Sequence, residues 1–145
     1  MGGMTTNRFS SGVVPVNLCA MHSSAKSLMI LVAGPYRTGT GDDPEKMRQN
    51  LQVLEEAALL LYRAGHIPMI GEWVALPLLR VAGSTQVGDA LWQEILYPVA
   101  HRLSARCDAV LRLPGASVGA DEDVRLANER GLPVYYELRE VPGCG

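Results

Sequence analysis

The sequence predicts an α/β sandwich, with helices on both faces of a mostly parallel sheet of four to five strands. Residues 28–33 form an unbroken apolar run, which is typical of a strand buried on both faces. Helical and strand-like patterns then alternate as far as residue 138, the order that produces a parallel sheet. Glycine-rich loops follow the first and third strands. In such folds ligands bind beyond the carboxyl ends of the strands.

The first helix is expected to begin at Asp43, a capping residue followed by proline and an acid, and to end at Gly65. Its apolar residues recur at spacings of three and four, so they share one face: Met47, Leu51, Leu54, Ala58 and Leu61. Residues 66–70 indicate a second strand. Pro68 cannot donate a ladder hydrogen bond, so this strand is expected to be an edge strand or an irregular one.

The second half of the chain is less regular. Residues 71–85 contain Trp73, Pro77 and two glycine breaks, which favour a lid or wall over a regular element. Residues 86–106 predict a helix kinked at Pro98. A third strand over 107–113, a short helix over 121–130 and a last strand over 133–138 complete the pattern.

Composition limits the function. A chain of 145 residues suits one domain, expected over 27–141, with a flexible leader or tag over 1–26 and a tail over 142–145. A net charge of −2 and scattered arginines argue against a nucleic-acid polymer as partner. Three cysteines without paired spacing favour a reduced, cytoplasmic protein. Neither metal nor cofactor is expected, and no apolar run is long enough for a membrane span.

Two loops carry the candidate chemistry. The first, over 34–41, brings Tyr36 and Arg37, and the second, over 115–123, brings Ser117, Gly119 and three acids. Backbone N–H groups at a helix start bind small anions, and the helix dipole favours negative charge there. The two loops therefore predict one nucleotide-like pocket. Acids at a helix start also serve simply as caps.

These motifs, in their order, resemble the nucleoside 2-deoxyribosyltransferase-like superfamily. The resemblance covers roughly residues 28–138 and includes the segments 33–37, 65–68, 107–110 and 117–123. It implies a flavodoxin-like three-layer fold, a homodimer or homotetramer, and cleavage or transfer at the N-glycosidic bond of a deoxynucleoside or its 5′-monophosphate. No cofactor is implied.

The resemblance also assigns roles to residues. Gly34, Tyr36 and Arg37 match the loop that holds the sugar and, in monophosphate hydrolases, the 5′-phosphate. Ser117 and Gly119 match a second phosphate-contacting turn. Asp123 stands where the family has its nucleophilic glutamate, with Tyr36 beside it as the second catalytic residue. Glu122 is the neighbouring acid, and Trp73 is a candidate to stack on the base, with packing or an interface as its alternative.

Aspartate at position 123 is a departure from that pattern. Its side chain is shorter by one methylene, about 1.5 Å, and misplacement by about 1 Å can cost on the order of 100-fold in rate. The helix dipole is expected to keep Asp123 ionised, which suits a nucleophile. The family's base-contacting aspartate has no clear counterpart, His101, Glu94 and Asp89 being the nearest polar residues.

Three functions remain open at this point. The first is an N-glycosidase or deoxyribosyltransferase that uses Asp123. The second is a non-catalytic nucleotide-binding sensor or regulator on the same fold. The third is a flavodoxin-like protein that binds another phosphate ligand such as a flavin, although the first loop lacks the Ser/Thr-rich run that wraps a flavin phosphate.

Overall fold

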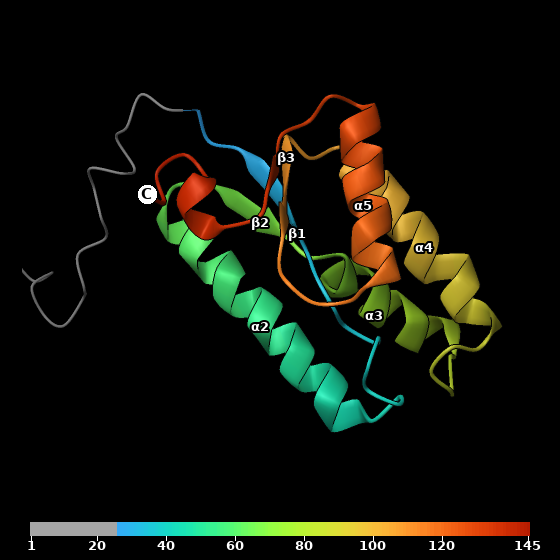
Figure 1. Cartoon of the computed structure of the whole chain (residues 1–145). Coiled ribbons are helices and arrows are strands. Elements are labelled where there is room, and N and C mark those ends of the chain that lie inside the picture. Colours follow the sequence, from blue (N-terminus) through green and yellow to red (C-terminus); the bar gives the residue numbers. More distant parts are fainter. Residues whose placement is uncertain (1–25) are drawn as a thin grey trace, which may run out of the picture.

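The computed structural model describes residues 26–145; residues 1–25, which hold most of the predicted leader, lie outside the described residues. The described chain forms a four-stranded, all-parallel sheet in the order β2-β1-β3-β4, flanked by four α-helices. This topology is flavodoxin-like, and it confirms the predicted α/β fold (Figure 1).

The strands are short and centred on β1 (Met29–Ala33). β1 pairs with β2 (Ile67–Met69) on one side and with β3 (Ala109–Arg112) on the other, and β3 also pairs with β4 (Val134–Tyr135). β2 lies at the edge of the sheet, as Pro68 predicts. Because the strands are parallel, their carboxyl ends lie on one side of the domain.

The two faces of the sheet carry separate apolar clusters. α2 (Pro44–Arg63) covers one face, where Leu54 and Leu61 pack with alternate strand residues such as Ile30. α5 (Val118–Glu129) and the end of α4 (Ala90–Ser104) cover the other, where Ala127 packs with Leu31. Alternation of strand side chains between two covered faces explains the continuous apolar run of β1.

Residues 71–85, expected to be a lid or wall, instead form mostly a helix, α3 (Gly71–Ala82). Ala75 and Leu79, four residues apart, are buried on its inner face, and Gly83 ends it in the left-handed conformation with φ of 94°. Pro77 lies inside the helix. The burial of one face outweighs the hydrogen bond that proline removes, so the prediction from local breakers was wrong.

Capping side chains shift the other boundaries. α4 begins at Ala90 because Asp89 is its N-cap, and the Asp89 carboxylate accepts the N–H of Leu91. The same carboxylate also accepts the backbone N–H groups of Thr85 and Gln86 in the preceding loop. α5 begins at Val118, three residues before the predicted start, because Ser117 is its N-cap. β4 is only two residues long, and the chain then turns into a 3₁₀ helix, η2 (Leu138–Glu140).

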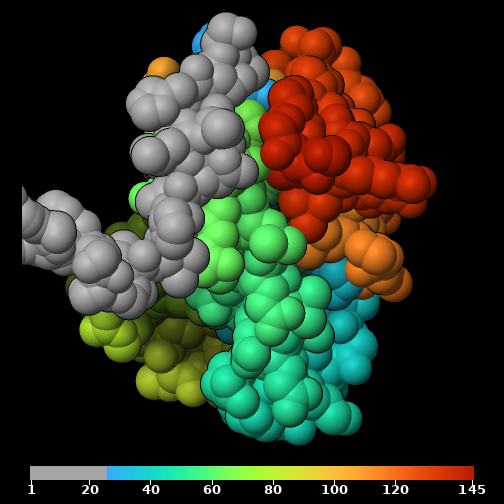
Figure 2. Space-filling model, turned by 90° about the vertical axis from the view of Figure 1, so that its left-hand side faces the viewer, coloured from blue at the N-terminus to red at the C-terminus, as the bar shows by residue number. Residues whose placement is uncertain are grey.

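The end of the chain packs on the domain. The ring of His66 accepts the N–H of Leu28 through Nδ1 at 3.1 Å, and its Nε2 lies 2.6 Å from the carbonyl oxygen of Pro142. Cys144 packs against the cluster under α2. Figure 2 shows this C-terminal segment, in red, directly beside the green end of α2.

Within residues 26–145 no helix combines the length and the apolar character needed to cross a membrane.

Candidate functional site

The two glycine loops meet at the carboxyl edge of the sheet. A Cβ at Gly34 would lie 2.8 Å from Cδ2 of Leu54 and 3.2 Å from Cβ of Leu113, where the second loop begins. A Cβ at Gly115 would lie 2.7 Å from Cγ of Pro35. Only glycine permits both close approaches, so the two loops touch at Gly34 with Leu113 and at Gly115 with Pro35. The predicted juxtaposition is confirmed.

One cavity of about 590 Å³ opens beside this contact. That volume lies in the range of small-molecule sites, about 300–1,000 Å³. Its walls come from the end of β1, the first loop, the start of α3, one side of α4 and the start of α5. The residues that line it and carry polar or charged side chains are Tyr36, Arg37, Thr38, Asp42, Glu72, Tyr97, Ser117 and Asp123.

Asp123 presents an unsatisfied carboxylate to this site. Its Oδ1 is buried and has no hydrogen-bond partner among residues 26–145. A buried polar atom without a partner costs free energy, so it needs either a proton or a ligand. Asp123 is therefore the described residue whose environment most directly indicates a binding or catalytic role.

Burial raises the pKa of Asp123 from 3.8 to about 7, with smaller contributions from the negative charges of Glu72 and Glu122, against the opposing effect of Arg112. The expectation that the helix dipole keeps Asp123 ionised was wrong. Because α5 begins at Val118, Asp123 lies in its second turn, and the dipole acts mainly within the first. Loss of hydration dominates there instead.

Glu72 is a second carboxylate of the cavity, and the sequence pattern did not predict it. It is the second residue of α3, directly after β2, and burial raises its pKa. Its charge raises the pKa of both Asp123 and Tyr36, so the three side chains face the same space. A residue that follows a strand at the carboxyl edge of a parallel sheet is a candidate site residue by its topology alone. The position of Glu72 could be predicted in this way only if residues 71–82 were recognised as a helix.

Tyr36 is half-buried on the cavity wall. Burial, with a smaller effect from the charge of Glu72, raises the pKa of its phenol, so Tyr36 remains a neutral donor at physiological pH. Its backbone carbonyl accepts a 2.9 Å hydrogen bond from Nδ2 of Asn50 on α2. Asn50 thus fixes the first loop to α2.

Arg37 lines the cavity, but its guanidinium is already paired. Nε and Nη2 donate to the two carboxylate oxygens of Asp42 at 2.7 and 3.1 Å. The guanidinium carbon also lies 5.6 Å from the centre of the Trp92 ring. The predicted phosphate-binding arginine is therefore held in an ion pair within its own loop.

The second loop is organised by Arg112, the last residue of β3, which the sequence analysis did not single out. Its side chain, only 10% exposed, donates to the carbonyl oxygens of Leu113 and Gly115 and to Oδ1 of Asp121. Ser117 Oγ accepts the N–H of Ala120 at 3.1 Å. The hydroxyl predicted to contact phosphate therefore caps α5, while Gly119 lies open on the cavity wall.

Two predicted site residues lie outside the cavity. Glu122 is held by Arg125, whose guanidinium lowers the pKa of that carboxyl, and His101 lies 3.8 Å from it on α4. Trp73 donates its indole N–H to Glu55 on α2. Neither Glu122 nor Trp73 is among the described residues that line the cavity.

Among the described residues, no group of three or more histidine, cysteine, aspartate or glutamate side chains is arranged to hold a metal ion. The sulfur of Cys107 is buried near Asp123, and burial raises the pKa of its thiol to about 11, which makes it an inert thiol at neutral pH.

Comparisons of the chain with models of known families, with curated proteins and with solved structures found no match. The class defined here is therefore a flavodoxin-like α/β domain with a carboxylate-lined cavity at the carboxyl edge of its sheet.

Proposed function

We propose that this protein cleaves, or transfers across, the N-glycosidic bond of a nucleoside or deoxynucleoside. The observation that carries the proposal is the carboxylate of Asp123, whose Oδ1 is buried without a hydrogen-bond partner and which shares a ligand-sized cavity with Glu72. Enzymes that cleave glycosidic bonds commonly use two carboxyl groups in different environments, one as the nucleophile and the other as the general acid. The motif resemblance points to the same bond.

In this mechanism Asp123 is the nucleophile and Glu72 is the general acid and base. The ionised carboxylate of Asp123 attacks C1′ of the sugar, and the electrons of the C1′–N bond pass to the base, which takes a proton from Glu72. Water, or a second base, then attacks C1′ and releases the Asp123 carboxylate, while Glu72 recovers a proton from the incoming group. Burial raises the pKa of both acids, and the charge of Glu72 raises the pKa of Asp123 further, which suits a pair that shares one proton.

Other residues orient the substrate. Tyr36 is a neutral donor in reach of the same space and suits a sugar hydroxyl. The open backbone at Gly119 lets the substrate approach the start of α5 closely. The wall of Leu96, Tyr97 and Ala100 on α4 supplies apolar surface for the base.

Release of free base tests the proposal. The protein is incubated with a panel of nucleosides and deoxynucleosides, and the bases are separated by chromatography. We expect release that falls at least 100-fold in both Asp123→Asn and Glu72→Gln. Glu122→Gln serves as the matched control, because it removes a neighbouring carboxylate outside the cavity, and it should retain activity.

A second function, a nucleotide- or nucleoside-binding sensor without turnover, is favoured by one observation: aspartate is shorter than the glutamate it replaces in the motif. A thermal shift with nucleosides, without release of base over many hours, would assign this function instead. Base release by the unaltered protein excludes it.

A further inference from the structure

We propose that the cavity takes a nucleoside with an uncharged 5′ end in preference to the 5′-monophosphate, because Asp42 occupies the place on Arg37 that a phosphate needs. This inference rests on the proposed function and refines its substrate class. The motif resemblance leaves both classes open, and the structure supplies the reason to choose.

The pairing of Asp42 with Arg37 has the form of anion recognition. Two nitrogens of one guanidinium, Nε and Nη2, donate to two oxygens of one carboxylate, at 2.7 and 3.1 Å. Arginine binds a phosphate through the same bidentate arrangement. Asp42 is thus an internal substitute for the anion, and it occupies the side of the guanidinium that offers two parallel donors.

Two further sides of the guanidinium are covered, although 41% of the Arg37 side chain is exposed to solvent. The ring of Trp92 lies over the guanidinium, 5.6 Å from its centre to the carbon. The backbone of Gly88 approaches so closely that a Cβ there would lie 2.5 Å from Nη2. A phosphate that uses the same two parallel donors, Nε and Nη2, therefore has to displace Asp42 from this solvent-exposed pair.

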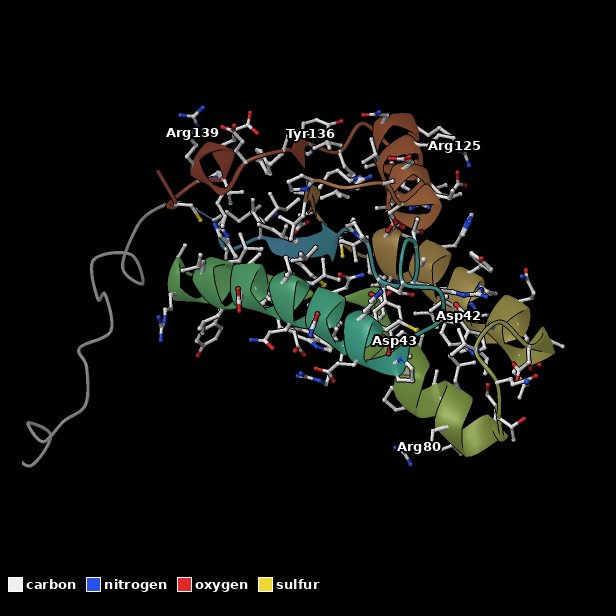
Figure 3. All side chains as sticks on the ribbon, turned by 60° about the horizontal axis from the view of Figure 1, so that its bottom comes forward. Asp42, Asp43, Arg80, Arg125, Tyr136 and Arg139 are labelled. Carbon is white, nitrogen blue, oxygen red and sulfur yellow. The ribbon has the colours of Figure 1, made fainter. Side chains whose placement is uncertain are left out.

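The loop is built to hold Asp42 in this place. Asp42 has a φ of 62°, in the left-handed region that only a few residue types adopt readily. Its N–H donates to Oγ1 of Thr40 at 3.2 Å, and that hydroxyl donates to the carbonyl of Arg37 at 2.6 Å. Figure 3 shows Asp42 on the loop and Asp43 next to it at the start of α2.

The charge of the cavity acts in the same direction. Among the described residues that line it, Arg37 is the one cation, whereas Asp42, Glu72 and Asp123 are acids. Once Arg37 and Asp42 neutralise each other, a phosphate dianion meets the ionised carboxylate of Asp123, with Glu72 as the protonated acid. Like charges brought together in a site are unfavourable, and a neutral ribose or deoxyribose hydroxyl avoids that repulsion.

The ratio of kcat/KM for a deoxynucleoside to that for its 5′-monophosphate measures this preference. We expect the unaltered full chain to favour the deoxynucleoside at least tenfold. In Asp42→Asn, which frees Arg37 and suits a positive φ, the ratio should shift toward the monophosphate by at least tenfold. Asp43→Asn is the matched control. It removes the same charge one residue away, outside the cavity, and asparagine still caps α2.

Three results would overturn the inference. They are a preference for the monophosphate in the unaltered protein, an unchanged ratio in Asp42→Asn, or an equal change in Asp43→Asn. In each of these the proposed function stands, because base is still released. Absence of both binding and release with either class, measured by calorimetry and chromatography, would overturn the proposed function together with the inference.

Discussion

The indole N–H of Trp73 donates a hydrogen bond of 2.7 Å to the carboxylate of Glu55, which ties the first turn of α3 to the middle of α2. The bond fixes the ring on the outer surface, where it is 38% exposed. It also fixes the start of α3, the turn that brings Glu72 into the cavity. This position favours a role for Trp73 in packing α3 against α2 over contact with a base.

Replacing Trp73 with phenylalanine should lower the free energy of unfolding by about 1 kcal/mol, since the hydrogen bond to Glu55 is lost while most of the ring area remains. Glu55→Ala should cost a similar amount, and the double variant no more than either alone, as measured by urea unfolding. Nucleoside affinity should stay within a factor of about three. A large loss of affinity in Trp73→Phe without a loss of stability would place the ring on the base after all.

The raised pKa of Asp123 makes stability depend on pH. The folded protein holds this proton up to about pH 7, whereas the unfolded chain releases it near 3.8. The folded state binds more protons in between, so the contribution of Asp123 to stability falls as pH rises from about 4 to 7, by on the order of 3–4 kcal/mol. Asp123→Asn should therefore melt several degrees above the unaltered protein at pH 8, and at the same temperature near pH 4. Equal melting temperatures at pH 8 would contradict the burial of this carboxylate.

Glu72→Gln should lower the pKa of Asp123, because it removes the charge that contributes most after burial. In a pH series monitored by carbon NMR of the aspartate carboxyls, the Asp123 transition should move below pH 7. Glu122→Gln should produce a smaller shift, since Glu122 is paired with Arg125 and exposed to solvent screening. A larger shift in Glu122→Gln than in Glu72→Gln would show that Asp123 faces away from the cavity.

Two glycines of the site should respond in opposite ways to alanine. Gly34→Ala forces a methyl into Leu54 and Leu113 and should cost about 1–3 kcal/mol in the free energy of unfolding. Gly119→Ala meets nothing within 4 Å and improves helix propensity, so it should stabilise α5 by up to about 1 kcal/mol. Chemical denaturation of both variants tests the pair. Equal costs would mean that the loops do not touch at Gly34.

The framework was predictable because burial leaves a strong pattern. The apolar run before Gly34 predicted that β1 is buried on both faces. Asp43 and Gly65 predicted the two ends of α2 to within two residues of the observed bounds. The meeting of the two loops also followed from topology, since both lie after parallel strands. These features depend on periodicity and turn chemistry, which a single sequence displays.

What was missed depends on tertiary contacts. α3 was hidden by Pro77, whose local cost is offset by the burial of Ala75 and Leu79. Glu72 was missed as a consequence, because its place in the cavity follows from α3. The ionisation of Asp123 was predicted wrongly because α5 begins at Val118, three residues before the expected helix start, which moves Asp123 away from the end of the dipole. Sequence patterns show which residues are apolar, but not how much water remains around an acid.

His66 joins the beginning of β1 to Pro142 through the two nitrogens of one ring, at the amino ends of the strands and away from the cavity. A reporter protein fused after Gly145 would therefore emerge at the pole opposite the proposed substrate entrance. Immobilisation through that end offers a practical way to present the cavity freely to ligands on a sensor surface.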